Sequence, residues 1–405
     1  NYWSVDLLVH FTSLISLFKI GIPAITIVAL LVSGFHASNF GTSVQQFMPY
    51  GSSAVLKATT TAGIIFSLNA FQTIINIGND LQKSYVNMKR AINISLGISV
   101  VIYILLQLAF IGAIDPNMLA KVGWSGIDFS SPFADLATLL GLYWLSVLLY
   151  LDAFVSPFGT GVSTVASSGR ALAAMVSNDH LPKFIGAINE RYHVPRTAML
   201  FNVAVSLVMV TFFRSWGTLA TVISSLMLIA YLTGPISVVA FRKMGPEFAR
   251  PIKIRLVKAT SIVAFALVSL AIYWAMWPTT LEVVAIILVG LPIYFVYEWK
   301  TGWANTRNQV RGSLWMICYL VVLIALSWVG SRDFNGLGLI PYPLDQLVVV
   351  LVSLVFYHWG TNSHLFTKYF QRAKRLNDRK VRIPHRHRVE AAERRHREET
   401  SEAAN

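Results

Sequence analysis

Long apolar runs alternate with short polar segments along the first 360 residues of the chain. A bilayer core of about 30 Å requires about 20 apolar residues in a helix. Backbone groups in lipid must pair within their own segment, so each apolar run predicts a helix, and the alternation typical of membrane β-strands is absent from them. The predicted fold class is an all-α, polytopic membrane protein with about ten transmembrane helices, at approximately 14–33, 59–78, 91–113, 141–169, 197–213, 217–241, 256–277, 281–299, 312–330 and 345–360.

The composition agrees with this pattern. Charged residues make up 13% of the 405 residues, whereas a soluble domain typically carries about 25%. That shortage argues against a soluble enzyme, a disordered protein and a nucleic-acid-binding module. The single cysteine, Cys318, excludes an internal disulfide framework and a cysteine-based metal cluster.

The net charge of +14 is an orientation signal. Cytoplasmic loops of membrane proteins carry an excess of Lys and Arg. With the N-terminus placed inside, 28 of the 33 Lys and Arg residues fall in inside segments and four in outside segments, while Lys19 lies within a span. Both ends of the chain are therefore predicted to be cytoplasmic. The basic tail from residue 361 is either a solvated, partly helical end or a segment that lies on anionic lipids.

Three amides recur on the second predicted span. Asn69, Gln72 and Asn76 are spaced at i, i+3 and i+7, which places them on one face of a continuous helix. Polar groups at membrane depth are expensive, so this face could line a cavity. The same residue types also hold helices together in membranes. Spacing alone leaves both interpretations open.

Two charged residues lie within predicted spans. Lys19 is in the first span, where it could extend to the interface or act as a buried, proton-exchanging amine. Asp152 is in the fourth span, where it is either an interfacial carboxylate or a functional acid. The fourth span is also rich in small residues, among them Ser163 and Thr164, and Pro157 weakens its helix.

No catalytic signature competes with a transport function. The sequence contains no HExxH motif, no GxSxG motif and no Walker A loop. Polar groups in interrupted membrane helices are typical of secondary transporters. The sequence therefore predicts a transporter and not an enzyme. A channel or a membrane-embedded enzyme is a weaker alternative, because neither a pore-lining repeat nor a catalytic set is present.

Two stretches resemble a known transporter family. One is Phe66-Ser67-Leu68-Asn69-Ala70-Phe71-Gln72 with its exit Gly78-Asn79-Asp80-Leu81-Gln82-Lys83; the other combines Ser168-Gly169-Arg170, Asn178-Asp179-His180-Leu181-Pro182 and Val194-Pro195-Arg196-Thr197-Ala198. Together they resemble the amino acid–polyamine–organocation superfamily, whose members have the LeuT-like fold. Bacterial aspartate–proton symporter-type permeases look nearest. Three positions depart from the family pattern: Ala70 replaces its helix-breaking glycine, Ser84-Tyr85 replaces Asn-Pro, and His180 stands where glycine is usual.

The resemblance also implies a domain organisation. The first span corresponds to the fifth helix of the family, and the last four spans to helices eleven to fourteen. Residues 1–360 then form the transmembrane permease region, divided into the end of a first repeat (1–34), a second inverted repeat (35–243) and four additional helices (244–360), with a basic cytoplasmic tail at 361–405. The chain begins at Asn1, and we expect it to be N-terminally truncated, without the first helix that holds the substrate's carboxylate and amine.

Roles for individual residues follow from the same resemblance. Substrate contacts are implied for Phe66, Asn69, Ala70, Phe71 and Gln72, with Phe66 or Phe71 as a gate. Lys19 matches a lysine that takes the place of a sodium ion in proton-coupled members, and Ser163 and Thr164 fall near that ion site.

The implied function is proton-coupled import of an amino acid by alternating access, in the bacterial inner membrane. Aspartate or another acidic amino acid is the expected substrate. The coupling ion would be H⁺, and no cofactor, metal or nucleic acid is expected. Besides the substrate, the expected partners are the lipid bilayer and, at the basic tail, anionic lipids. The alternatives are an amino acid exchanger and a carrier of polyamines or cationic amino acids on the same fold.

Overall fold

The computed structural model describes residues 5–69, 71–76, 84–177, 181–187, 195–212, 215–248, 250, 254–301, 306–364 and 370–375. Every regular element in these residues is a helix, and none is a strand. This confirms the predicted all-α class. The chain divides into two compact units: the first contains Asn1–Met227, Trp274–Gly302 and Asp333–Asn335, and the second contains Leu228–Tyr273, Trp303–Arg332 and Gly336–Asn405.

Within the described residues, seven helices are long and apolar enough to cross a membrane. They lie in α1 (Val5–Ser33), α6 (Ser84–Ala113), α9 (Tyr143–Ser177), α11 (Trp216–Met244), α13 (Thr279–Thr301), α14 (Thr306–Val329) and α15 (Leu344–Asn362). Two further apolar helices, α10 (Arg196–Phe212) and α12 (Val257–Tyr273), have 17 residues each, which is the lower end of the spanning range. The chain is thus a polytopic membrane protein.

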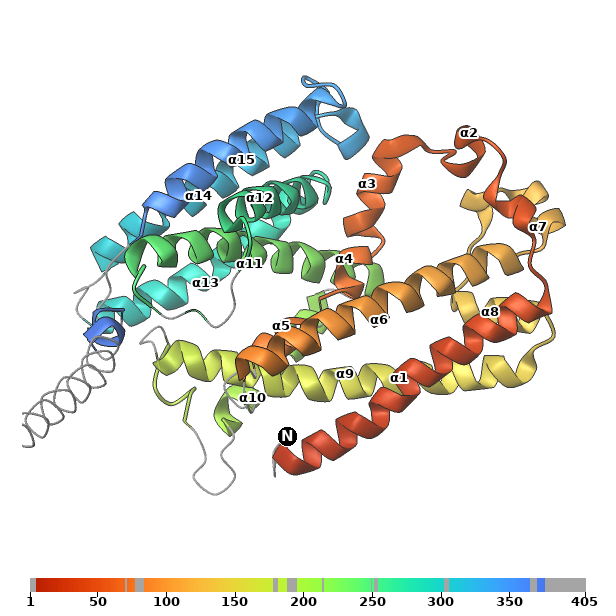
Figure 1. The fold of residues 1–405 in the computed structure, drawn as a ribbon, viewed down its shortest axis with the longest axis horizontal. Helices are drawn as coiled ribbons and strands as arrows, with labels where there is room; N and C mark the ends of the chain where they lie inside the picture. Colours follow the sequence, from red (N-terminus) through yellow and green to blue (C-terminus); the bar gives the residue numbers. More distant parts are fainter. Residues whose placement is uncertain are drawn as a thin grey trace, which may run out of the picture. The chain divides into compact units, whose positions relative to one another are not determined.

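The second predicted span, 59–78, is not one helix. It is divided among α3 (Gly51–Thr61), α4 (Ile64–Ser67) and α5 (Phe71–Asn76) (Figure 1). Gly63, between α3 and α4, has a left-handed backbone with φ of +77°, a conformation that glycine adopts without a steric penalty. The helix is therefore interrupted at Gly63 even though Ala70 stands where the family has its glycine.

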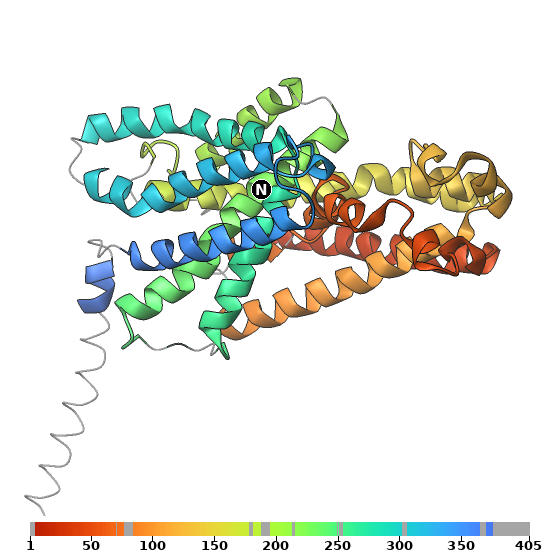
Figure 2. The ribbon, with the colours of Figure 1, turned by 90° about the horizontal axis from the view of Figure 1, so that it is seen from above.

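The long helices of the first unit pack around α9. α1 packs against both α9 and α6, and α5 also contacts these two helices. α6 (the long orange helix in Figure 2) runs without a break over its 30 residues, in contrast to α3–α5. Buried side chains of α1, α6 and α8 (Pro132–Leu139) form one apolar core cluster, which consists of Leu30, Ala109, Ala113, Ile114 and Leu136.

A short 3-10 helix, η1 (Ala37–Phe40), is bonded to the C-terminal end of α6. The side-chain amide nitrogen of Asn39 donates to the carbonyl oxygens of Ile111 and Ile114, each at 2.8 Å. The amide N–H of His36 donates to the Gly112 carbonyl at 2.8 Å. The last carbonyls of a helix have no partner within the helix, and these bonds satisfy three carbonyls at or next to the end of α6.

The second unit contains an aromatic core. α12 packs against α14 and α15, and α14 packs against α15. Phe265 is fully buried on α12, and its ring contacts those of Trp315, Tyr319 and Tyr357. The buried hydroxyl of Tyr319 donates to the Ser269 hydroxyl, so its polar group is satisfied within the core.

The connections contain short helical pieces. They are α2 (Val44–Phe47), α7 (Pro116–Val122), η3 (Trp124–Gly126) and η4 (Arg332–Phe334). Asp115 caps α7 by accepting the Asn117 amide N–H at 2.9 Å, and Pro116 occupies the first turn. Both are typical signals of a helix N-terminus.

Candidate functional site

The sequence-predicted substrate residues lie on or beside the interrupted helix. Phe66 is on α4, Asn69 is in the turn after it, and Phe71 and Gln72 form the start of α5. Ala70 lies outside the described residues, as does the exit motif at 78–83. Asn69 is buried, with 9% of its surface exposed, and the other three side chains are half-buried. The structure therefore brings four of the five predicted substrate residues into one short, irregular segment.

One detail of the sequence interpretation is wrong. The spacing of Asn69, Gln72 and Asn76 predicted a shared face of a continuous helix, but Asn69 lies in a turn, where helical spacing does not apply. The amide N–H of Asn69 donates to the Phe66 carbonyl at 3.2 Å, and the Asn69 carbonyl accepts the Gln72 amide N–H at 3.2 Å. These turn bonds replace the regular helical ladder through this segment.

A tyrosine of α6 supports the interruption. The Tyr103 hydroxyl donates to the backbone carbonyl of Ser67, the last residue of α4, at 3.2 Å. Backbone polar groups at membrane depth need such partners where a helix is interrupted. Tyr103 did not figure in the sequence interpretation, because a lone tyrosine in an apolar span gives no signal of its partner.

Amides of α5 connect the interrupted helix to α9. The side-chain nitrogen of Gln72 donates to the Asn76 side-chain oxygen at 3.4 Å, and the Asn76 nitrogen donates to the buried Ser167 hydroxyl at 2.8 Å. At this end of the segment the amides bind a neighbouring helix, which is the second of the two interpretations that spacing left open.

Lys19 contacts α9 within the first unit. Its ammonium nitrogen donates a hydrogen bond to the Thr160 hydroxyl, and Thr160 in turn donates to the Ser156 carbonyl at 3.0 Å. Lys19 is half-buried on α1. Close contact between the helices holds this geometry: a Cβ atom added at Gly159 would lie 2.5 Å from the Cγ2 atom of Ile15. Glycine at 159 allows α1 to approach α9 one turn before Lys19.

Ser163 and Thr164 follow Thr160 by three and four residues, so they lie one turn further along α9. The Ser163 hydroxyl donates to the Gly159 carbonyl at 3.1 Å, and the Thr164 carbonyl accepts the Ser168 hydroxyl at 2.6 Å. The hydrogen-bond partner of Lys19 is thus the neighbouring Thr160. A signal for Thr160 existed in the sequence, because polar residues recur at every fourth position from 152 to 168.

Asp152 lies at the start of this series. Its carboxylate oxygen Oδ1 accepts the Ser156 hydroxyl at 2.5 Å, one turn before Thr160. The side chain is half-buried. At the other end of the series, the Asn202 side-chain nitrogen of α10 donates to the Ser168 hydroxyl at 2.6 Å. α9 therefore presents polar groups that bind α1, α5 and α10.

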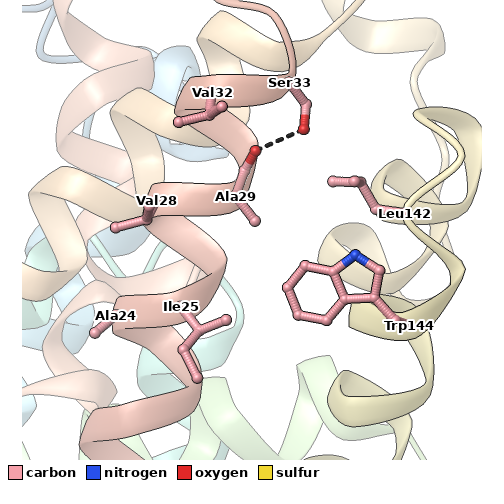
Figure 3. A pocket seen from close by; sticks show the side chains of 8 residues that line it. All are labelled: Ala24, Ile25, Val28, Ala29, Val32, Ser33, Leu142 and Trp144. Carbon is pink, nitrogen blue, oxygen red and sulfur yellow. Dashed lines mark hydrogen bonds between the residues drawn. The ribbon is translucent and has the colours of Figure 1, made fainter.

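The first unit also has an apolar groove of about 550 Å³ (Figure 3). Six of its lining residues are on α1, between Ala24 and Ser33, and the other two are Leu142, just before α9, and Trp144, in its first turn. The Ser33 hydroxyl is turned back to the Ala29 carbonyl at 2.7 Å. No charged side chain lines the groove, so it offers no cation to pair with an amino acid carboxylate.

Among the described side chains, no group of three or more His, Cys, Asp or Glu is placed to hold a metal ion. The first unit instead offers a cation, a carboxylate, hydroxyls and amides at membrane depth. Such groups can bind a zwitterion and exchange a proton, and each is costly in a bilayer without a role or a partner.

Comparison with known proteins extends over most of the chain. A family described as "Amino acid permease" matches residues 1–297. The glutamate/serine transporter AimA of Bacillus subtilis (strain 168) is 44% identical over 377 residues, which cover 93% of this chain and 70% of that protein. The aspartate-proton symporter of the same organism is 32% identical over 364 residues, which cover 89% of this chain and 69% of that protein. A mouse protein, the large neutral amino acids transporter small subunit 2, is 24% identical over 272 residues, which cover 66% of this chain and 49% of that protein.

Proposed function

The chain belongs to the amino acid permease family and is an integral membrane amino acid transporter, not an enzyme; from this premise we propose that it imports an acidic amino acid together with a proton. Transport would proceed by alternating access, in which the site opens to one side of the membrane at a time. The family match agrees with the superfamily that the motifs indicated. The substrate class, the coupling ion and the transport cycle are the proposal.

The names of two relatives support the substrate class. One is called a glutamate/serine transporter and the other an aspartate-proton symporter. An acidic substrate carries one more carboxylate than a neutral amino acid, and it needs donors for that group. Asn69 and Gln72 carry amide groups of this kind, on the segment that also holds Phe66 and Phe71. We assign the substrate side chain to this segment.

The observation that carries the coupling role is the contact between Lys19 and Thr160. It places an ammonium group between α1 and α9 inside the transmembrane region. A lysine amine can gain and lose a proton when its surroundings change. A change in the contact between α1 and α9 would then be linked to the protonation of Lys19. Ser163 and Thr164, one turn further along α9, are proposed to take part in the same rearrangement.

The test is uptake of radiolabelled L-glutamate and L-aspartate into proteoliposomes under an imposed pH gradient. The Lys19→Ala variant of the full chain should lose proton-driven accumulation. Lys57→Ala, on α3, removes a lysine outside these contacts and should accumulate substrate as the wild type does. Undiminished pH-gradient-driven uptake by Lys19→Ala would contradict the coupling role.

Two further measurements separate the alternatives. Uptake that requires internal amino acid and ignores the pH gradient would indicate an exchanger instead of a symporter. Competition by unlabelled glutamate, aspartate, serine, lysine and putrescine would define the substrate class. Inhibition by lysine or putrescine, without inhibition by the acidic amino acids, would overturn the acidic assignment.

A further inference from the structure

α9 carries a carboxylate and two hydroxyls at four-residue intervals before it meets Lys19. The Ser156 hydroxyl donates to Asp152 at 2.5 Å, and Thr160 donates to the Ser156 carbonyl while it accepts from the Lys19 ammonium. Residues four apart on a helix lie on neighbouring turns of one face. The negative charge of Asp152 and the positive charge of Lys19 therefore lie along the same side of α9.

We infer that Asp152 is the counter-ion of Lys19, and that it positions the ammonium and favours its charged form during transport. This role rests on the proposed proton coupling and adds a residue that acts through Lys19. Asp152 is a positioning residue, because no substrate contact is assigned to it.

The other polar and charged side chains on the helices around α9 differ from Asp152 in their position or in their hydrogen-bond partners. Among the described side chains, α8 brings Asp135 towards α9, but Asp135 accepts the Ser131 amide N–H at 2.9 Å and the Tyr150 hydroxyl at 3.3 Å. α5 contributes the uncharged amides Gln72 and Asn76. The arginines of α9 and α10, Arg170 and Arg196, lie at the far end of the series, near the contact of Gly169 with Met199. Asp152 is the carboxylate of the α9 face that Lys19 contacts, joined to it through Ser156 and Thr160.

The physical reason is the cost of an isolated charge in the membrane. A carboxylate at this depth is stabilised by an opposite charge and by donors to its oxygens. The Ser156 hydroxyl supplies a donor, and Lys19 supplies the charge. When Lys19 releases its proton, Asp152 loses that compensation, so the two protonation states differ in how strongly they favour the packing of α1 on α9. A difference of this kind is what a coupled transporter requires.

The first variant is Asp152→Asn, which keeps the shape and removes the charge. Without the carboxylate, the protonated amine loses stabilisation. The alkaline limb of the pH profile of substrate uptake should therefore move to lower pH, by about one pH unit. Because the midpoint of a profile does not depend on protein amount, the shift is readable even if expression falls. A wild-type midpoint in Asp152→Asn would overturn the inference.

Three companion variants exclude a merely structural effect. Asp152→Glu keeps the charge and should keep the midpoint. Ser156→Ala removes the hydroxyl donor but not the charge, so it should shift the midpoint in the same direction by less. Asp135→Asn removes a carboxylate that is bonded elsewhere and should leave the profile unchanged. If Asp152→Asn does not reach the membrane, a shifted Asp152→Glu or an unshifted Ser156→Ala overturns the inference.

The Lys19→Ala experiment separates the two claims. If Lys19→Ala retains proton-driven uptake, the proposed coupling fails, and the role of Asp152 fails with it. If Lys19→Ala loses uptake while Asp152→Asn keeps the wild-type profile, only the counter-ion role of Asp152 fails.

Discussion

The two units treat polar groups inside the membrane region in different ways. In the first, half-buried side chains such as Lys19, Asn76 and Asn202 each donate a hydrogen bond to another helix. In the second, two polar pairs are enclosed in the core. Tyr273 and Asp345, bonded at 2.8 Å, are 1% and 2% exposed, and the Tyr319–Ser269 pair lies beside fully buried Phe265.

The difference indicates that the two units have different structural roles. Enclosed pairs in an aromatic core rigidify a structure, since breaking one leaves a buried polar group without a partner. An isolated hydrogen bond between partly exposed side chains of two helices costs less free energy to break, because water can replace the lost partner. We therefore expect the first unit to be the region that changes its contacts during transport and the second to be a stable support.

The largest expected effect is on the second unit. Phe265→Ala would leave a cavity among Trp315, Tyr319 and Tyr357 and should lower the free energy of unfolding by about 3–5 kcal/mol. The thermal midpoint in detergent measures it. Transport by the folded fraction should keep the wild-type KM and pH profile. A changed pH profile would contradict the division between the two units.

A smaller effect is expected where α1 meets α9. Gly159→Ala would place a methyl group against Ile15 and should cost about 1–3 kcal/mol through overpacking. Gly161→Ala is the matched control, because nothing lies within 4 Å of its added Cβ. The second substitution Ile15→Ala should restore part of the loss in Gly159→Ala. Equal thermal midpoints for the two glycine variants would show that α1 does not pack closely at Gly159.

The bond between α9 and α10 should be weaker still. Asn202→Ala and Ser168→Ala should each destabilise the protein, with a coupling energy near 0.6 kcal/mol in a double-mutant cycle. Additive effects of the two substitutions would contradict the 2.6 Å bond between these side chains.

The smallest effect concerns an exposed ion pair of the second unit. A backbone hydrogen bond, with a second bond from the Lys374 ammonium at 2.9 Å, lowers the pKa of Glu247 below its ordinary value of 4.5. A lowered pKa adds stability at neutral pH that is lost as the pH falls below about 4.5 through the pKa of the folded state. Glu247→Gln should flatten the acid limb of the thermal midpoint against pH. At 1 M salt the difference between the variant and the wild type should shrink, because screening weakens the attraction of Lys374; an unchanged difference in high salt would exclude a contribution from the ion pair.

The sequence predicted most helices because apolar length is a local property. The first span ends at Ser33, as predicted, and the third ends at Ala113. The residue pattern did not locate the break within the predicted span 59–78. The break depends on the left-handed backbone of Gly63 and on the hydrogen bond that Tyr103 donates to the Ser67 carbonyl. The recurrence of polar residues along α9 marks Thr160 as one of several candidates, but its pairing with Lys19 depends on how α1 is rotated against α9. The roles of the site residues stay predictions until uptake is measured.

The two bonds from Asn39 to the end of α6 have a mechanical consequence for α1. Residues 34–36 alone separate α1 from η1, so the C-terminal end of α1 is tethered to α6. Lys19 lies about 21 Å from that end along the helix axis. A tilt of about 10° around the tether would displace the Lys19 backbone by about 4 Å, which exceeds the length of a hydrogen bond. If α1 tilts as a rigid body about Ser33, a rotation of this size is enough to carry the Lys19 backbone away from Thr160.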